Sequence, residues 1–365
     1  QTQRKCHEIP KCPNLYIDAF RTHKQQFLSP KKAAVFILTH YHADHYTGLP
    51  RDYNPPSSLS KSESSKIHCT PITAALLKHV HGVHEDIVIE HEYGVTWDFI
   101  VEEEEEEDRK KTTTRAEITF YDANHCPGAA IVFIRLVHTT TTTTTATTNS
   151  TTITTTTTTQ HLHTGDFRYH SKMNDYPLLQ QASLNGSSSL LDVLYLDTTY
   201  SHPKYDFVDQ NVAVDLVVSQ VMHHLLLSSS DDDDESTNCN NDNNNQKDEK
   251  EVIGKDNAFS CTTTTTTTTN NNTNNCTKRN NNNNNQENDN NSSDDDGKTL
   301  ILLSCYSIGK EKILWQVSNQ TNQLIYVNEK KYKMLQCIQS PSLLLPLPTV
   351  TKNNNNNNNN NDDDN

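Results

Sequence analysis

The sequence lacks the long apolar runs, the apolar leader and the paired cysteines that would assign it to several large protein classes. No apolar run approaches the length needed to span a membrane, and the first residues, QTQRKCHEIP, contain no apolar signal core. The nine cysteines are scattered and include no Cys-x-x-Cys pair, which is typical of free thiols in a reducing compartment and not of a disulfide scaffold. We therefore expect a soluble, intracellular protein.

Apolar residues are also scarce in four tracts: an acidic run at 102–108, a threonine-rich stretch at 139–159, a mixture of Asn, Asp and Thr at 229–297, and an Asn/Asp tail at 353–365. Such tracts bury too little apolar surface to offset the entropy of ordering, which predicts disorder. All but the threonine-rich stretch are acidic, and these three hold 25 of the 46 acidic residues but five of the 31 basic ones. The rest of the chain thus carries about +5 in place of the formal −15, which is compatible with a nucleic-acid partner.

Short apolar runs separated by turns make up the rest of the chain. The pattern predicts strands at 15–20, 33–40, 116–125 and 129–138, with the threonine-rich stretch as an expanded loop between two paired strands. LLDVLYLDTTY reads as a buried strand, and KTLILLSCYSIGKEKILWQV as strand, loop and helix. Helices are predicted at 71–80, with Thr70 as N-cap, and at 207–227. The expected class is α/β or α+β with layered sheets.

Three histidines and an aspartate follow the second predicted strand within six residues. His40, His42, Asp44 and His45 form the pattern His-x-His-x-Asp-His in FILTHYHADHYTGL. Because side chains alternate along a strand, His40 and His42 lie on one side, and the following turn can bring Asp44 and His45 to a neighbouring point. Imidazole and carboxylate groups at this spacing suit zinc and similar metals. The alternative is a cluster of surface histidines, and we favour the metal site.

Four further residues of ligand type stand where apolar strands end. Asp18 ends LYID, His125 follows the strand in YDANHCPGA, Asp166 lies in LHTGDFR, and Asp197 ends LYLD. A carboxylate at the position of Asp166 can bridge two metal ions. Active sites of α/β sheets lie at the carboxyl ends of strands, so the recurrence of this arrangement at five strand ends predicts one shared site.

The motifs FILTHYHADHYTGL, DANHCPGAA, LHTGDFR, LYLDTTY and YSIGKEK, in this order, resemble the metallo-β-lactamase/β-CASP nucleases. Within that superfamily they are most similar to the DNA cross-link repair exonucleases, the relatives of Artemis and Apollo. KCPNLYIDAF and KKYKMLQC also resemble segments of that family, so the resemblance covers almost all of the chain outside the low-complexity tracts. It implies an incomplete metallo-β-lactamase αββα sandwich with part of an inserted β-CASP cap domain. We place the metallo-β-lactamase domain at residues 1–200, the partial cap domain at 201–352 and a tail at 353–365.

Carried over residue by residue, the resemblance implies one or two divalent metal ions, the first of them zinc, with zinc, Mg²⁺ or Mn²⁺ at the second site when it is occupied. The first would be held by His40, His42, His125 and Asp166, and the second by Asp44, His45 and the bridging Asp166. Asp18 would orient a ligand, and Asp197 would support the site and proton transfer. A water activated by the metal would attack the phosphodiester, and Asp44 would orient or deprotonate it.

The loop CYSIGKEK offers a glycine and exposed backbone N–H groups at the start of a helix. Ser307, Gly309 and Lys310 are therefore candidates to bind a phosphate, and a simple helix-starting turn is the equal alternative. Surface or packing roles are expected for the remaining histidines considered, and packing roles for two cysteines near the site: His7, His79, His81, His84, His161, Cys126 and Cys305.

The family pattern includes a further metal-ligand histidine and a closing strand–helix unit after the cap domain, whereas no histidine follows His224 here. We expect this chain to be a fragment of a longer protein; the alternative is an inactive relative. The leading functional hypothesis is a metal-dependent 5′→3′ DNA exonuclease of cross-link repair, located in the nucleus and acting on single-stranded or damaged ends with a 5′-phosphate. A small-molecule hydrolase, lactamase- or glyoxalase-like, and a catalytically inactive DNA-binding relic are the alternatives.

Overall fold

The structure, a computed structural model, describes residues 7–30, 32–57, 64–105, 110–145, 150–177, 191–229 and 301–338. The chain divides into two compact units. The first comprises Gln1–Lys204, Tyr306–Lys310 and Tyr326–Asn365, and the second comprises Tyr205–Cys305 and Glu311–Ile325. The disorder predicted for residues 230–297 and 353–365 lies outside the described residues.

The first unit begins with a four-stranded parallel sheet in the order β1-β2-β3-β4. Its strands are short: β1 Leu15–Ile17, β2 Val35–Ile37, β3 Lys66–Cys69 and β4 Val88–Glu90. All three residues of β2 are buried, as its continuous apolar run predicted. The two strands predicted at 15–20 and 33–40 are thus present but shorter, because polar residues that face the site follow each of them.

A second sheet of the first unit has the order β5-β6-β7-β8-β9. Its first four strands are antiparallel neighbours, and β9 pairs with β8 in parallel. The bounds are β5 Thr96–Glu105, β6 Lys110–Asp122, β7 Ala130–Thr145, β8 Ser150–His163 and β9 Val193–Tyr195. Strands β6 and β7 confirm the two strands predicted on either side of the Cys-Pro-Gly turn.

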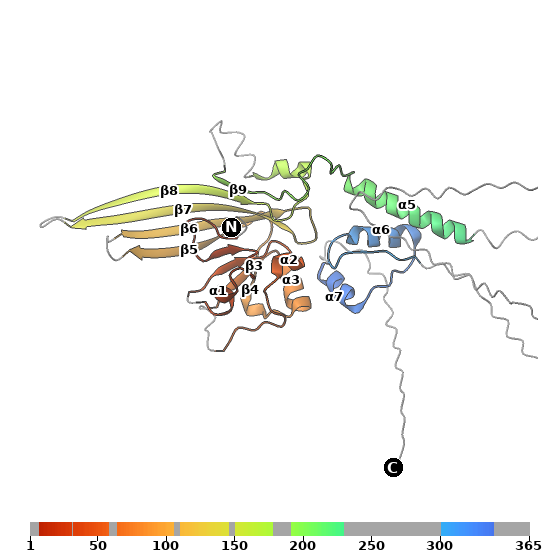
Figure 1. Ribbon diagram of the computed structural model, residues 1–365, viewed down its shortest axis with the longest axis horizontal. Coiled ribbons are helices and arrows are strands. Elements are labelled where there is room, and N and C mark those ends of the chain that lie inside the picture. Colours follow the sequence, from red (N-terminus) through yellow and green to blue (C-terminus); the bar gives the residue numbers. More distant parts are fainter. Residues whose placement is uncertain are drawn as a thin grey trace, which may run out of the picture. The chain divides into compact units, whose positions relative to one another are not determined.

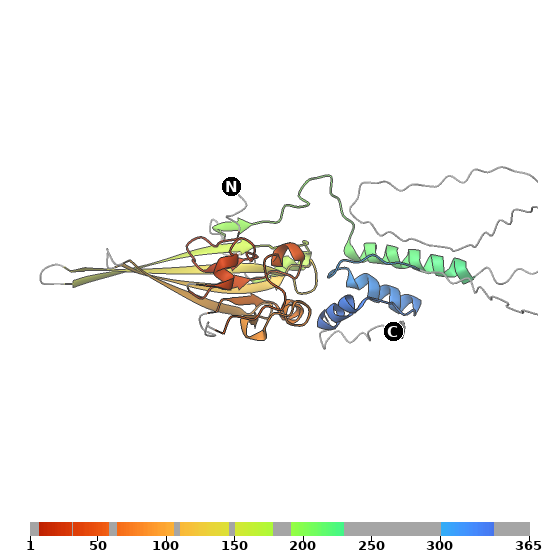
Figure 2. The ribbon, with the colours of Figure 1, turned by 60° about the horizontal axis from the view of Figure 1, so that its bottom comes forward.

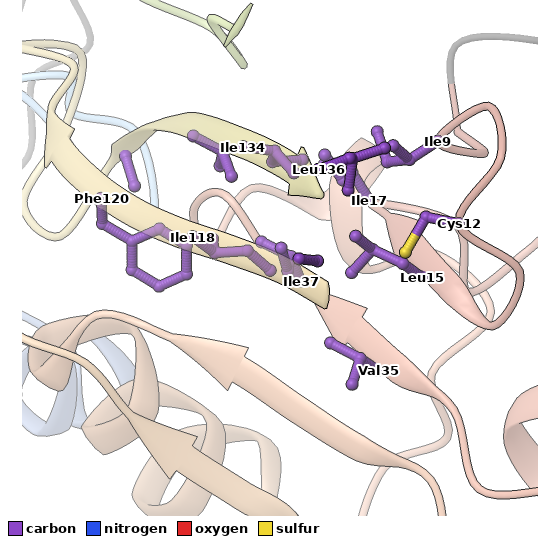
Figure 3. Packing of buried hydrophobic residues seen from close by; sticks show 13 residues of the cluster. Ile9, Cys12, Leu15, Ile17, Val35, Ile37, Ile118, Phe120, Ile134 and Leu136 are labelled. Carbon is purple, nitrogen blue, oxygen red and sulfur yellow. The ribbon is translucent and has the colours of Figure 1, made fainter. Parts of the chain in front are cut away.

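The two sheets of the first unit pack through one apolar core (Figure 3). Ile17 and Ile37 come from the parallel sheet, and Ile118, Phe120 and Ile134 come from β6 and β7; all five are fully buried. Alternation along β6 and β7 places these apolar residues on one face. Burying a side chain of this size contributes about 1.5–3 kcal/mol, so this core fixes the strand ends that carry the polar residues.

The threonine-rich tract differs from its predicted disorder. Strand β7 continues to Thr145 and β8 begins at Ser150, in an unbroken register from Val132↔His163 to Thr145↔Ser150. These strands extend well beyond the parallel sheet (Figures 1 and 2). Threonine is β-branched and favours extended backbone, so a ribbon that starts in the apolar core can continue through it without apolar side chains. Likewise the acidic residues 102–105 belong to β5, whereas 106–108 lie outside the described residues.

The helix predicted at 71–80 begins as α3 Pro71–Leu76 and then changes type. It continues as a π-helical segment, Leu77–His81. Thr70 makes no side-chain cap and instead donates to the carbonyl of Gly128 at 2.7 Å. In the part of the first unit that the structure describes, the other helices are α1 Lys24–Leu28, α2 Ala43–Tyr46, the 3₁₀ segments Glu85–Ile87 and Ser171–Asp175, and α7 Glu329–Ile338.

The second unit contains α5 Gln210–Ser229 and α6 Glu311–Thr321, which lie side by side (Figures 1 and 2). Val214, Val218 and Val221 of α5 pack with Val317 of α6 in a small core. The helix predicted at 207–227 is confirmed with a slightly later start. Among the helices that the structure describes, none is long and apolar enough to cross a membrane.

Two predicted strands differ from the structure. Strand β9 was expected to be buried, but Leu194 is 50% exposed because β9 is an edge strand. Residues 301–305, expected to form a strand before the YSIGK turn, lie in irregular backbone. The mixed α/β class with two sheets is confirmed.

Candidate metal centre

The polar residues singled out in the sequence stand just beyond the ends of strands that run in the same direction. Strands β6, β8 and β9 are mutually parallel because β7 is antiparallel to both β6 and β8. His125 follows β6, Asp166 follows β8 and Asp197 follows β9. Asp18 and His40 likewise follow β1 and β2, which are parallel neighbours. The carboxyl ends of parallel strands meet at one sheet edge, which brings these side chains together.

Thr39 joins the two sheets at this edge. Its N–H donates to Oδ1 of Asp18 at 2.9 Å, and its carbonyl accepts the N–H of Ala130 at 2.9 Å. Gly165 has a φ of +54°, and a Cβ there would lie 3.1 Å from Cβ of Thr39. A glycine therefore allows the β8 end to approach Thr39 closely, which brings Asp166 to the histidines.

A first group of four ligand-type side chains converges beside Thr39. The ligand atoms of His40, His42, His125 and Asp166 all lie within 4.8 Å of one another. Nδ1 of His42 lies 2.9 Å from Nε2 of His40 and 3.1 Å from Nε2 of His125. Metal–nitrogen bonds of 2.0–2.1 Å in a tetrahedral zinc site place ligand nitrogens about 3.3 Å apart. Three imidazoles and one carboxylate at these separations fit a single divalent ion.

Hydrogen bonds on the far side of two rings direct a lone pair into this group. The hydroxyl of Thr39 donates its proton to Oδ2 of Asp18 at 2.7 Å, so it accepts from Nδ1 of His40 at 3.0 Å. Nε2 of His42 faces the carbonyl oxygen of Ile308 at 3.1 Å and must donate to it. In each ring the other nitrogen then carries the lone pair that a metal requires.

A second group consists of Asp44, His45 and Asp166, whose ligand atoms also lie within 4.8 Å of one another. Nε2 of His45 lies 3.6 Å from Oδ2 of Asp44 and 3.4 Å from Oδ1 of Asp166. Its Nδ1 donates to Oδ2 of Asp18 at 2.8 Å. The other oxygen of Asp166, Oδ2, lies 3.7 Å from Nε2 of His125. Asp166 thus faces both groups with different oxygens, which is the arrangement of a bridging carboxylate.

Burial and pairing set the charges of these side chains. Burial lowers the pKa of His40 to about 2, and burial also lowers that of His125, so both rings are neutral at pH 7. The hydrogen bond with His45 lowers the pKa of Asp166 to about 2, which keeps it ionised. Burial alone would raise the pKa of Asp18, but the hydrogen bond from His45 and its charge outweigh this and lower it. Neutral imidazoles beside a carboxylate are the protonation states in which the first group can bind a metal. Burial would lower the pKa of His45, but its hydrogen bonds with Asp166 and Asp18 outweigh this and raise the pKa to about 10, so a metal in the second group would have to displace a proton from this ring.

Four predicted site residues stand at the margin of these groups: Asp197, Ser307, Gly309 and Lys310. Asp197 is not among the metal-ligand groups found in the described residues; its Oδ1 accepts from the N–H and hydroxyl of Thr199 at 2.9 and 2.7 Å. Gly309 and Lys310 both have left-handed backbone, with φ of +99° and +65°. Nζ of Lys310 lies 4.7 Å from the centre of the Tyr306 ring. Ser307, Gly309 and Lys310 lie in one turn, and the carbonyl of Ile308 in this turn accepts from the candidate ligand His42.

Two of the other histidines considered, His7 and His81, have structural contacts. His81 is buried and bonds the Tyr41 hydroxyl at 3.2 Å, and His7 bonds the carbonyl of Ile17 at 2.9 Å. Cys126 is buried, as expected for a packing residue. Two groups that shape the site were missed in the sequence: Thr39, which precedes the histidine motif directly, and the carbonyl of Ile308, since a backbone acceptor leaves no side-chain signal.

Comparison with known proteins identifies several relatives that are named for DNA cross-link repair. The chain is 30% identical over 217 residues to the DNA cross-link repair protein SNM1 of Arabidopsis thaliana, which covers 59% of this chain and 34% of that protein. It is 24% identical over 327 residues to the human DNA cross-link repair 1A protein, covering 90% of this chain and 20% of that one. The 5′ exonuclease Apollo of Gallus gallus is 29% identical over 171 residues, covering 47% and 26%.

No family model matches the chain. The chain spans about a third or less of the length of each of these three relatives. The relatives nonetheless confirm the resemblance drawn from the strand-end motifs: the chain is similar to DNA cross-link repair proteins and to a 5′ exonuclease, as those motifs predicted.

Proposed function

We propose that the chain is the metal-binding part of a metal-dependent DNA nuclease of cross-link repair. The observation that carries the proposal is the position of Asp166 between two ligand groups, with one oxygen toward each. A pair of metals that share a carboxylate can clamp both the attacking and the leaving oxygen of a phosphodiester. Phosphodiester hydrolysis uses such a pair, and the DNA-repair relatives favour DNA as the substrate.

The donor atoms favour zinc in the first group. Three imidazoles with one carboxylate are typical of zinc, whereas the more exposed second group, with two carboxylates and one imidazole, would accept zinc, Mg²⁺ or Mn²⁺. When bound, these ions lower the pKa of a water molecule and neutralise charge on the phosphodiester.

Each polar side chain then has a distinct role. Asp44 is 78% exposed and stands on the solvent side of the ligands, so it would orient the attacking water and accept its proton. Asp18 would hold His45 in position through its 2.8 Å hydrogen bond. Asp197, which follows β9 at the same edge, would assist proton transfer. The buried His40 would fix the first ion.

The turn at 306–310 would bind the DNA. Ser307 and Tyr306 are exposed, and Lys310 carries its charge beside the Tyr306 ring. The turn offers a lysine and backbone N–H groups for a 5′-phosphate, and the exposed ring for stacking on a base. The relative named a 5′ exonuclease favours 5′→3′ digestion, and the relatives named for DNA cross-link repair favour a nuclear location.

A substrate panel tests the proposal. The full chain, loaded with zinc or Mn²⁺, is incubated with single-stranded DNA bearing a 5′-phosphate, the same DNA with a 5′-hydroxyl, and a chromogenic β-lactam. The expected result is stepwise shortening from the 5′ end, faster with the phosphate and lost in Lys310→Ala, with no lactam turnover. Lactam hydrolysis would support the small-molecule reading. DNA binding without cleavage under any metal would support the inactive-relic reading.

A further inference from the structure

The orientation of His42 depends on a turn that lies far along the chain. Nε2 of His42 lies 3.1 Å from the carbonyl oxygen of Ile308, although 266 residues separate them. Both belong to the first unit. The carbonyl can only accept, so it selects the form of the ring protonated at Nε2. Nδ1 then keeps a lone pair toward His40 and His125.

Lys331 holds this turn from the other side. Its Nζ donates to the carbonyls of both Tyr306 and Ser307 at 3.1 Å each. Its backbone N–H donates to Oδ1 of Asn328 at 2.8 Å at the start of α7, which fixes the helix end that carries it. The side chain of Ile308 is fully buried, so the turn is anchored at its apolar residue and clamped at the two carbonyls before it.

α7 belongs to the first unit and is fixed there by contacts of its own. Met334 and Leu335 are buried, and Sγ of Cys337 lies 3.6 Å from the carbonyl of Ala75 in α3. Gly309 and Lys310, with their left-handed backbone, reverse the chain directly after Ile308. The direction of the Ile308 carbonyl therefore depends on two fixed points, the buried Ile308 side chain and the ammonium group of Lys331.

We propose that Lys331 is a positioning residue for the metal centre: it clamps the 306–308 turn so that the Ile308 carbonyl holds His42 with Nδ1 toward the first metal. The inference rests on the proposed metal site and deepens it. Groups that orient a metal-ligand histidine are typically worth about 10–100-fold in metal affinity. Lys331 acts through one more contact, so its loss is expected to cost about tenfold, the low end of that range.

The test measures zinc affinity of the full chain by competition with a chromogenic chelator. Lys331→Met is compared with Lys331→Arg, which keeps donors for the two carbonyls, and with Lys330→Met, which alters the adjacent exposed lysine of α7. We expect about tenfold weaker binding in Lys331→Met, recovery of most of it in Lys331→Arg, and wild-type affinity in Lys330→Met. Equal affinity in Lys331→Met and the wild type would overturn the inference.

A measurement on the unaltered chain covers the case in which Lys331→Met does not fold. Nitrogen-15 spectra of the metal-free wild type report which ring nitrogen of His42 carries the proton, with His42→Gln used to assign the signal. The proposal requires the proton on Nε2; a proton on Nδ1 overturns it. A wild-type chain that binds no zinc would instead contradict the proposed function, so the two failures are distinct.

Discussion

Asp166 places its Oδ1 atom 3.4 Å from Nε2 of His45, and this contact joins the second ligand group to the first. The other oxygen of the same carboxylate lies among the histidines of the first group, 3.8 Å from Nε2 of His40. A side chain shared in this way cannot be lost from one group alone. The consequence is a difference between Asp166 and Asp44 that can be measured.

Asp166→Asn is expected to weaken binding of both metal ions, whereas Asp44→Asn is expected to weaken only the second. The amide removes the negative charge and one oxygen donor. Asp166 belongs to both ligand groups, whereas Asp44 belongs to the second group alone. Metal content after dialysis, measured by mass spectrometry, checks the prediction. Asp215→Asn, at an exposed position of α5 in the second unit, is the control and should retain wild-type content. Equal losses in the Asp166 and Asp44 variants would contradict the shared carboxylate.

Asp18→Asn is expected to weaken the second site by about 10–100-fold. Asp18 accepts from the hydroxyl of Thr39 and from His45 through the same oxygen, and an amide nitrogen at that position would repel both donors. Titration calorimetry with Mn²⁺ on the zinc-loaded chain measures the effect. Asp18→Glu keeps the negative charge but is longer by one methylene group, so this variant should bind Mn²⁺ with intermediate affinity. An unchanged Mn²⁺ affinity in Asp18→Asn would show that His45 is held by other contacts.

Gly48→Ala is expected to destabilise the chain more than Gly94→Ala. Both glycines have positive φ, +105° and +75°, so alanine costs roughly 1–2 kcal/mol at either position from backbone strain. At Gly48 the added Cβ would also lie 2.5 Å from the carbonyl oxygen of Phe20, whereas at Gly94 it meets nothing within 4 Å. Urea denaturation measures both free energies of unfolding. Similar losses of stability would mean that the backbone at Phe20 moves away from the added Cβ at no cost in free energy.

The chain is expected to lose stability as the pH falls below 6.5, in part through His68. Nδ1 of His68 lies 2.8 Å from Nε2 of His91, and both rings stack on Trp97. Burial lowers the pKa of His68 to about 3 and that of His91 to about 4, and repulsion from His91 and Lys66 adds to the shift of His68. Between pH 6.5 and 4 the unfolded chain therefore binds more protons than the folded one, so the free energy of unfolding falls as the pH falls.

The slope from one such histidine is at most about 1.4 kcal/mol per pH unit. His68→Gln removes this titration and should make stability less sensitive to pH between 6.5 and 5. Urea midpoints at three pH values measure the slope, with His79→Gln, at an exposed position of the neighbouring π-helical segment, as the control. Parallel pH profiles for His68→Gln and the wild type would refute the assignment.

The candidate site was largely predictable from the sequence because its residues follow strands whose apolar pattern is strong. His40, His125 and Asp166 each stand a few residues beyond a run that the core requires, so locating the runs also located these candidate ligands. The threonine tract was mispredicted because apolar content was used as the criterion, whereas β-branching and a ladder already started in the core decide its structure. The carbonyl of Ile308 was beyond prediction, since it depends on the path of the backbone after a long insertion.

The central claim is tested most directly by following phosphodiester hydrolysis against the number of bound metal ions. A 5′-phosphorylated, 3′-labelled DNA strand is incubated with metal-free chain while zinc and then Mn²⁺ are added back, for the wild type and Asp166→Asn. The account predicts shortening from the 5′ end that appears with metal, disappears with a chelator, and is at least a hundredfold slower in Asp166→Asn, about 2.7 kcal/mol or more. Hydrolysis at equal rates in the two proteins, or in the absence of metal, would contradict it.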